Sequence, residues 1–446
     1  MIRNIKSAIM AAAMVIPMIS VTAQNTYSGY FTDGYVYRHQ LNPAIGNEKA
    51  YISIPVLGNI NMALRSSNLG IDDILYKIDG KTTTFLNPNV SASEFMSNID
   101  DENKMGMDLK MEILSIGFKA FNGYNTIGIN LRTNLGMNVP GEMFRMLKEG
   151  ISNQTYHIED MNMHANAYAE IALGHSRSIN ENLRVGAALK FLLGGANIEA
   201  NYKKAELALG ENNWTATAEA EIQASMKGLQ YMTAVNETSG RHYVDDIDVE
   251  SPGIGGFGLA LDLGAEYKLK DWTFSAAILD LGFINWSNNW VASTNGVKTF
   301  ETNKYIFNVD DDAPNNFDDE MDRMTDELSA IYELDNNGDM GSRKQMLGAT
   351  LNLGAEYTLP SYKKLSFGAL STTRFQGDYI GNDTWTEFRV SANWTPWKSL
   401  SIGANALTGT YGFGYGAIIR FNGLHFAVDR IGNLGANFYL GTNIVF

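Results

Sequence analysis

The chain has no cysteine, only nine prolines in 446 residues, and fewer basic residues than acidic ones. The absence of cysteine excludes a disulfide scaffold, a thiolate metal site and a cysteine nucleophile. With 34 Lys and Arg against 49 Asp and Glu, the formal net charge is −15. That charge argues against binding nucleic acid through a basic surface. What the chain does contain, 45% apolar and 11% aromatic residues, is far too much for a disordered protein.

The first segment has the pattern of a secretory signal peptide. Arg3 and Lys6 precede an apolar run over 8–19, and Val21-Thr22-Ala23 supplies the small residues of a cleavage site. The run is too short for a membrane helix, and Pro17 interrupts it. We therefore expect residues 1–23 to be removed on export. No later window has the roughly 18 uninterrupted apolar residues that a membrane helix needs.

Beyond the leader, hydrophobic residues recur with a period of two. In 256–269, Leu259, Leu261 and Leu263 alternate with small or charged residues such as Asp262, and 124–139, 183–193 and 346–357 repeat the pattern. Successive strand residues point to opposite faces, so one face is apolar and the other polar. Runs of about 10 residues exceed ordinary strands and suit tilted membrane strands. A large β-sandwich also alternates, but continuous long hairpins favour an all-β, transmembrane, up-and-down antiparallel β-barrel.

The lengths of the connections predict how this barrel is oriented. Counting back from a last strand that ends in Phe446, every second connection is short and polar, as in bacterial barrels whose termini and short turns are periplasmic. We expect a barrel over 50–446 with about 14 strands, or about 16 if 197–208 and 214–226 also span. Charges such as Glu199 and Lys203 favour a hairpin beyond the membrane instead. The predicted long extracellular loops, with short helices in them, are 66–107, 138–163, 196–253 and 286–345.

Several strings resemble a known group of proteins. The chain is similar to an uncharacterised Bacteroidetes outer-membrane β-barrel family, within or near the superfamily of long-chain fatty-acid (FadL-like) channels. The resemblance is carried by Tyr37-Arg38-His39-Gln40-Leu41-Asn42-Pro43-Ala44, Ile54-Pro55-Val56-Leu57-Gly58-Asn59-Ile60, Leu114-Ser115-Ile116-Gly117-Phe118-Lys119-Ala120 and Tyr168-Ala169-Glu170-Ile171-Ala172-Leu173-Gly174-His175-Ser176. It implies that residues 24–49 form a periplasmic or plug segment, with Asn42 and Pro43 inside the lumen as candidate ligand-binding residues. The alternative is an ordinary turn, since Pro43 disfavours helix at Asn42.

A second group of candidate ligand-binding residues lies in a predicted helix over 140–150. Met143, Phe144, Met146 and Leu147 form an apolar stripe there. Methionine-rich surfaces adapt to irregular ligands, so the stripe could line a hydrophobic entry pocket. Packing against the barrel's own wall is the commoner role of such a stripe.

Motifs for catalysis or metal binding are absent or incomplete. Neither a Gly-x-Ser-x-Gly elbow nor a phosphate-binding loop occurs, and the six histidines lack the spacing of metal ligands. Residues 310–339 hold 12 acidic residues and one basic residue. Met340 and Met346 stand where a calcium loop needs Gly and Glu, which favours a solvated loop. We expect no catalytic site, metal site or cofactor.

Three functions remain after these exclusions. The resemblance implies a passive channel or binder for a hydrophobic small molecule in the outer membrane of a Gram-negative cell, in contact with outer-membrane lipid. A structural or secretion-associated barrel scaffold with a protein partner is the alternative. A lumenal enzyme, with its groups on distant strands, is the third.

Overall fold

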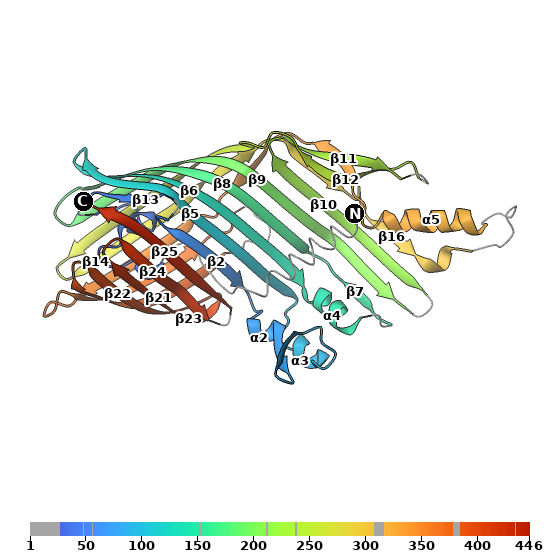
Figure 1. Cartoon of the computed structure of the whole chain (residues 1–446), viewed down its shortest axis with the longest axis horizontal. Helices are drawn as coiled ribbons and strands as arrows, with labels where there is room; N and C mark the ends of the chain where they lie inside the picture. The colour runs from blue at the N-terminus through green and yellow to red at the C-terminus, as the bar shows by residue number, and fades with distance from the viewer. Residues whose placement is uncertain are drawn as a thin grey trace.

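The computed structural model describes residues 27–47, 49–55, 57–150, 153–210, 213–236, 239–306, 316–377, 384–432 and 434–446. Within them, antiparallel strands close into a 14-strand barrel (Figure 1). The prediction of a transmembrane-type barrel with 14 strands is therefore confirmed. The predicted signal peptide, 1–23, lies outside the described residues. The wall strands are β1 (Tyr51–Ser53) continued by β2 (Ile60–Ser66), β5 (Glu102–Ala120), β6 (Gly123–Pro140), β8 (Met161–Ser178), β9 (Leu183–Leu209), β13 (Gly256–Leu269), β14 (Trp272–Trp286), β19 (Thr350–Thr358), β20 (Leu365–Arg374), β21 (Trp385–Trp397), β22 (Leu400–Gly409), β23 (Gly412–Phe421), β24 (Leu424–Gly432) and β25 (Gly435–Val445).

The barrel closes between the two ends of the chain. β25 pairs with both β1 and β2, in registers such as Ile52↔Ile444 and Met62↔Phe438. β1 and β2 pair on their other side with β5. Every wall strand therefore has two neighbours, and two stacked sheets are excluded.

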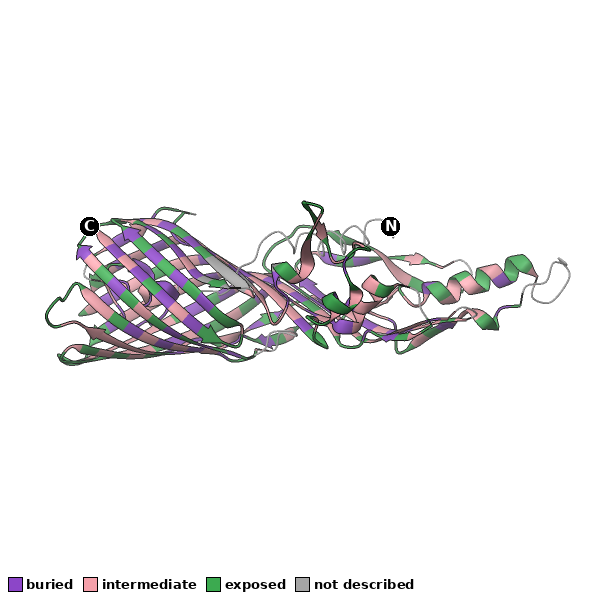
Figure 2. Cartoon of the chain, turned by 90° about the horizontal axis from the view of Figure 1, so that it is seen from below, coloured by how far each residue is buried: buried purple, intermediate pink, exposed green. Residues whose placement is uncertain are grey.

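The period-two pattern places apolar side chains outside and polar ones inside. Leu259 and Leu263 are 45% and 44% exposed on the outer wall, whereas Asp262 between them is 2% exposed. Figure 2 shows this alternation as diagonal bands of buried and exposed residues around the barrel. An apolar outer band is what acyl chains require of a barrel wall. Among the described residues, no helix combines the length and the apolar character needed to cross a membrane.

The first wall strand is divided into β1 and β2. Pro55 lies in the stretch between them, and proline has no N–H to donate to a strand ladder. β25 still contacts this segment, because the N–H of Thr442 donates to the carbonyls of Leu57 and Gly58 at 3.0 and 3.1 Å. The wall is thus continuous across the interruption.

Short and long connections are separated between the two ends of the barrel. At one end the strands join through tight turns, in which Phe121, Asn122, Lys270 and Asn422 have positive φ angles of 54, 57, 56 and 52°. Two consecutive positive φ values, as at Phe121 and Asn122, characterise the type I′ hairpin turn. At the other end, 67–101 forms a small subdomain of α2 (Ile71–Ile74), β3 (Leu75–Ile78), β4 (Lys81–Thr84) and α3 (Ala92–Met96), followed later by α4 (Gly141–Glu149) and β7 (Thr155–His157). We call these the short-turn end and the long-loop end.

β9 continues far beyond the barrel at the long-loop end. Its 27 residues would span about 90 Å at roughly 3.3 Å per residue, several times what a membrane strand needs. The outer half of β9 pairs with β10 (Trp214–Met226), which pairs in turn with β15 (Asn289–Ser293) and β16 (Lys298–Glu301) instead of with a wall strand. The hairpin read as lying beyond the membrane is therefore not part of the wall. We call residues 196–254 and 287–345 the extension; its other elements are β11 (Leu229–Val235), β12 (His242–Val249), η4 (Thr302–Lys304), α5 (Phe317–Ser329), β17 (Asp335–Asp339) and β18 (Arg343–Met346).

Replacing an outward side chain of a wall strand should impair assembly. Leu263→Arg places a charge near the middle of β13 on the outer face, at a cost of about 2–4 kcal/mol. Heat-modifiable gel migration after refolding into lipid vesicles would measure the folded fraction. Thr273→Arg, on the next strand but facing the open inner mouth, is the matched control and should fold normally. Equal folding of both variants would contradict the assignment of faces.

Candidate functional site: the plugged lumen

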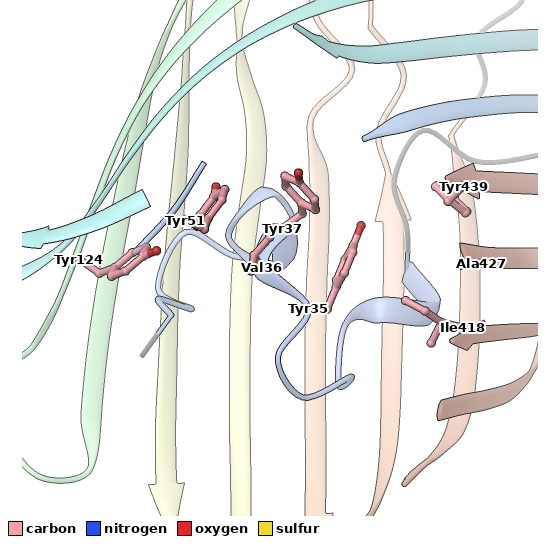
Figure 3. Packing of buried hydrophobic residues seen from close by; sticks show 8 residues of the cluster. All are labelled: Tyr35, Val36, Tyr37, Tyr51, Tyr124, Ile418, Ala427 and Tyr439. Carbon is pink, nitrogen blue, oxygen red and sulfur yellow. The ribbon is translucent and has the colours of Figure 1, made fainter. Parts of the chain in front are cut away.

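The lumen is occupied by the N-terminal segment of the chain. Residues 27–47, which we call the plug, contain two short 3-10 turns, η2 (Tyr27–Gly29) and η3 (Val36–Gln40). Its aromatic residues are almost completely buried; Tyr30 and Tyr37 are each 1% exposed. Figure 3 shows Tyr35, Val36 and Tyr37 between opposite walls, in a cluster completed by Tyr51, Tyr124, Ile418, Ala427 and Tyr439. The plug therefore forms a hydrophobic core inside the lumen.

The wall beneath the plug is built from glycines, which we call the glycine floor. A Cβ on Gly186 would lie 2.1 Å from the carbonyl oxygen of Pro43, and a Cβ on Gly264 would lie 2.0 Å from Oδ1 of Asn42. A Cβ on Gly368 would lie 2.3 Å from the ring of Phe31. Only a residue without a side chain allows the plug to approach the wall this closely. The floor comprises Gly186, Gly264, Gly354, Gly368, Gly403 and Gly416.

Asn42 fixes the end of the plug by satisfying backbone groups on both sides. Its Nδ2 donates to the carbonyls of Ala265 and Ala276 at 3.2 and 3.4 Å, and its Oδ1 accepts from the N–H of Ala44 at 2.9 Å. Asn352 of β19 donates to the carbonyl of Leu41 at 3.0 Å. Buried backbone groups need such partners, so this turn is held in one position.

The start of the plug is held by a buried ion pair. Arg389 of β21 makes two bonds to Asp429 of β24, Nη1 to Oδ1 at 2.7 Å and Nη2 to Oδ2 at 3.0 Å. Asp429 also accepts from the N–H of Ser28, whose hydroxyl receives bonds from Arg389 and from Asn405 at 3.1 and 2.8 Å. The wall charges thus position the plug while satisfying one another.

A second charge network lies on the opposite side of the lumen. Arg132 of β6 forms a two-point ion pair with Asp280, with both N–O distances 2.9 Å, and contacts Glu170 at 2.9 Å. Lys190 lies 2.6 Å from Asp262 and 2.7 Å from Asp280. A register shift in the β13–β14 ladder and a positive φ of 57° turn Asp280 inward. The bulge thereby supplies an inward carboxylate that an unbroken alternation would not provide.

Asp262 has a larger role than its sequence pattern indicated. It faces the lumen as the alternation predicts, yet it also accepts the N–H of the bulged Asp280 at 2.7 Å. Replacing it with alanine would therefore leave Lys190 with fewer carboxylates and the bulge without its anchor.

A cavity separates the plug from the β5–β9 side of the wall. Its volume is ≈40 Å³, and its lining includes His39 and Gln40 of the plug and Lys110, Glu170 and Lys190 of the wall. Gln40 joins plug to wall here, because it accepts from Lys110 at 2.9 Å and donates to Glu112 at 2.6 Å. A wider polar vestibule of ≈700 Å³ at the short-turn end shares Ile45 and Tyr124 with this cavity. The described spaces thus lead from the short-turn mouth to the side of the plug.

His39 is neutral in this position. Burial in the lumen, together with the positive charges of Lys110 and Lys190, lowers its pKa from 6.5 to about 4. A hydrogen bond of 3.0 Å joins its Nδ1 to the carbonyl of Val36 and acts in the opposite direction. Desolvation dominates because the charged imidazolium loses its hydration inside the barrel.

The structure separates the two groups of sequence-predicted candidates. Asn42 and Pro43 lie in the lumen, and Pro43 also lines the cavity. Met143, Phe144 and Met146 of α4 pack at the long-loop end, Phe144 with the aromatic residues of α3 and its neighbours and the two methionines beside Tyr156. Leu147 is exposed. Contacts within the loops thus account for the three packed α4 residues without a ligand.

Sequence reasoning missed the glycine floor and both ion networks. The signals were visible as glycines and charges on the polar faces of alternating strands, but their partners lie on other segments, from 38 positions away for Arg132 and Glu170 to 361 for Ser28 and Arg389. Within the described part of the chain, no group of three or more potential metal ligands is found. Asp335–Asp339, which resembles the start of a calcium loop, forms strand β17 and pairs with β15.

Comparison of sequences identifies the family. A model of a family of unknown function, DUF5723, matches residues 43–429. The chain belongs to this family. The matched residues run from Pro43 to Asp429 and include most of the barrel of this DUF5723 protein. No curated protein matches the sequence.

Solved structures similar to this DUF5723 barrel include outer-membrane hydrocarbon transporters. The toluene transporter TbuX of Ralstonia pickettii is 8% identical, with 96% of this chain and 95% of that chain covered and a TM-score of 0.43. The toluene transporter TodX of P. putida is 9% identical, with 96% and 94% covered and a TM-score of 0.37. A Pseudomonas aeruginosa FadL homologue is 11% identical, with 96% of each chain covered and a TM-score of 0.34. At these identities the similarity concerns the barrel fold and not the substrate.

Removing the buried arginine should destabilise the barrel. Arg389→Met leaves Asp429 as an uncompensated buried charge, which typically costs about 3–5 kcal/mol. Urea titration in detergent, monitored by tryptophan fluorescence, would measure the decrease in the free energy of unfolding. The double variant Arg389→Met/Asp429→Asn should recover only part of the stability, since Glu387, which also pairs with Arg389 at 2.6 Å, keeps its charge. A single variant as stable as the unchanged protein would contradict the role of the ion pair.

Acid should loosen the plug through His39. Because the folded pKa of about 4 lies below the value of 6.5, the released plug binds more protons than the docked plug. The contribution of His39 to docking is complete above pH 6.5 and declines as the pH falls towards 4. Limited proteolysis of the detergent-solubilised protein should therefore cleave residues 27–47 faster in this window. The same pH profile in His39→Gln would exclude this histidine as the cause.

Proposed function

We propose that this protein is an outer-membrane channel or binder for a hydrophobic small molecule, gated by residues 27–47. The observation that carries the proposal is the non-covalent plug seated on a glycine floor. A lumen built only for structural closure could be filled by wall side chains, as in small barrels. Here the wall strands instead have glycines where the plug lies against them, and a separate segment of the chain fills this part of the lumen. Such a segment can move without breaking the wall's ladder.

The charges around the plug suggest where movement begins. On one side the plug is anchored by Ser28 to a buried ion pair, whereas on the other side it borders the cavity and the vestibule. Displacement on that side would break the Gln40 bonds to Lys110 and Glu112 but would leave the strand ladder of the wall unchanged. The path for a ligand would then run along the β5–β9 side of the lumen.

An apolar cluster lies at the long-loop end of the lumen. Trp286, Ile284, Leu192 and Tyr168 form a buried cluster with Ala260 and Leu347 on the inner wall there. The indole N–H of Trp286 donates to Gln345 at 2.9 Å, and its ring packs over Gly194 and Gly256. An apolar ligand that passed this end of the lumen would meet these side chains only where they separate. We place the long-loop end outside the cell and the short-turn end in the periplasm, as the usual topology of these barrels requires.

A scaffold that binds a protein partner is the second candidate. The observation that favours it is the extension, which carries β9 and β10 far from the barrel and has no role in closing the lumen (Figure 1). The two functions are compatible, since the extension takes no part in closing the lumen.

Enlarging one residue of the glycine floor should open the gate. Gly264→Leu puts side-chain atoms where Asn42 now lies, so the plug should dock less well. Uptake of the hydrophobic dye N-phenylnaphthylamine into proteoliposomes should rise about tenfold if the free energy that favours the docked plug over the released plug falls by roughly 1.4 kcal/mol. Gly128→Ala is the matched control, because its Cβ meets nothing closer than 3.6 Å and it also lines the lumen.

Deletion of the plug provides a second measurement for the same hypothesis. A variant without residues 27–47 should be permanently permeable if it assembles, as judged by gel migration. Unchanged permeability in an assembled deletion variant and in Gly264→Leu would refute gating by the plug.

A further inference from the structure

Helix α5 in the extension leaves part of its apolar stripe exposed. In an ordinary surface helix the apolar stripe faces the core and charged residues face water. In α5 the most buried residues are instead Glu320 and Ser329, at 3% and 4% exposure, whereas Leu328 is 41% exposed. Met321 and Met324, which precede Leu328 by seven and four residues, lie on the same stripe and are only half-buried.

The polar side of the helix explains this orientation. Glu320 accepts from the N–H of Ile306 at 3.3 Å and from Arg323 at 2.7 Å. Glu327 accepts from the hydroxyl of Tyr305 at 2.8 Å and pairs with Lys304. Specific hydrogen bonds and ion pairs thus attach α5 to the segment that follows β16, and this attachment leaves Leu328 exposed and the two methionines only half-buried.

A second set of contacts holds the end of the helix. Arg241 donates to Ser329 at 3.3 Å and to Glu333 at 2.5 Å, and Ser329 donates to Glu333 at 2.8 Å. The helix is therefore fixed at both ends by polar groups. Among the apolar clusters of the described residues, none contains Met321, Met324 or Leu328.

The surroundings of the stripe carry a strong negative charge. The extension holds 23 acidic and 9 basic residues, a net charge of −14 out of −15 for the whole chain. Asp318 and Asp322 are exposed on the flank of the stripe. A second copy of this chain would bring the same charge to the contact, and so would the segment 307–315, which contains three aspartates and no basic residue. Like charges oppose both of these occupants.

We propose that α5 is the docking surface for a basic amphipathic helix of a partner protein. The partner's apolar residues would cover Met321, Met324 and Leu328, and its lysines or arginines would face Asp318 and Asp322. Methionine side chains adapt to the shape of a partner helix, and acidic flanks select basic sequences and accelerate encounter. α5 projects from the end of the extension farthest from the barrel (Figure 1), where a partner has free access. The surface is separate from the lumen and independent of transport.

A peptide-binding experiment tests this proposal on the full-length protein in detergent. The probe is a synthetic fluorescent helix with a leucine stripe and lysine flanks, and its counterpart has glutamate flanks. Fluorescence anisotropy should show binding of the lysine peptide alone, weakening as salt rises. The double variant Met324→Gln/Leu328→Gln should bind about tenfold more weakly, because two apolar contacts are lost.

Two control pairs separate docking from general attraction to an acidic surface. Met232→Gln/Val235→Gln removes two exposed apolar residues from β11 of the same extension and should leave the affinity unchanged. Asp318→Asn/Asp322→Asn should weaken binding more than Asp246→Asn/Asp248→Asn on β12. Equal effects of the paired variants, or no binding of the lysine peptide, would overturn the proposal. So would self-association of the unchanged protein in sedimentation that Met324→Gln/Leu328→Gln abolishes, because the occupant would then be a second copy.

Discussion

The close approach of the plug to the glycine floor is the contact on which the rest of the structure depends. Two polypeptide segments can lie this near only where one of them has no Cβ, and the distances at Gly186 and Gly264 leave no room for a methyl group. Because the plug lies against the wall there, its tyrosines fill the centre of the barrel and its backbone finds partners on several strands. The lumen is consequently closed by the chain's own N-terminal segment, while a cavity remains on the side of β5–β9.

The charges of the lumen follow from that closure. Once the plug excludes bulk water, each inward charge needs a partner, and the two networks centred on Arg389 and Arg132 provide them. The first network anchors the plug, whereas the second borders the cavity. The plug is therefore held on both sides, by Ser28 at the first network and by Gln40 and Asn42 beside the cavity.

The repeated hairpins illustrate how much of this arrangement could be predicted. Leu263-Gly264-Ala265 and Leu353-Gly354-Ala355 were interpreted as an apolar face alternating with a small or charged one, and that interpretation of the wall is confirmed by the structure. The same glycines have a second role beneath the plug, which period-two reasoning does not reveal. The bulge at Asp280 likewise departs from simple alternation, since a register shift depends on the neighbouring strand. For Met143, Phe144 and Met146, the structure shows packing within the loops, and that packing depends on segments distant in the sequence.

By itself, the sequence determined the barrel class, the facing of the strands and the separation of short turns from long loops, whereas it left both 14 and 16 strands open. These properties depend on the local alternation of apolar and polar residues and on the lengths of the connections. Both can be read directly from the sequence. Only the tertiary structure decided where the plug sits, which glycines receive it, which charges pair across the lumen and which way α5 turns its apolar stripe. Each of those features joins residues from 14 to about 400 positions apart, such as Ile306 with Glu320 and Ser28 with Asp429. No periodicity encodes such pairs, because they exist only once the strands have closed into a ring.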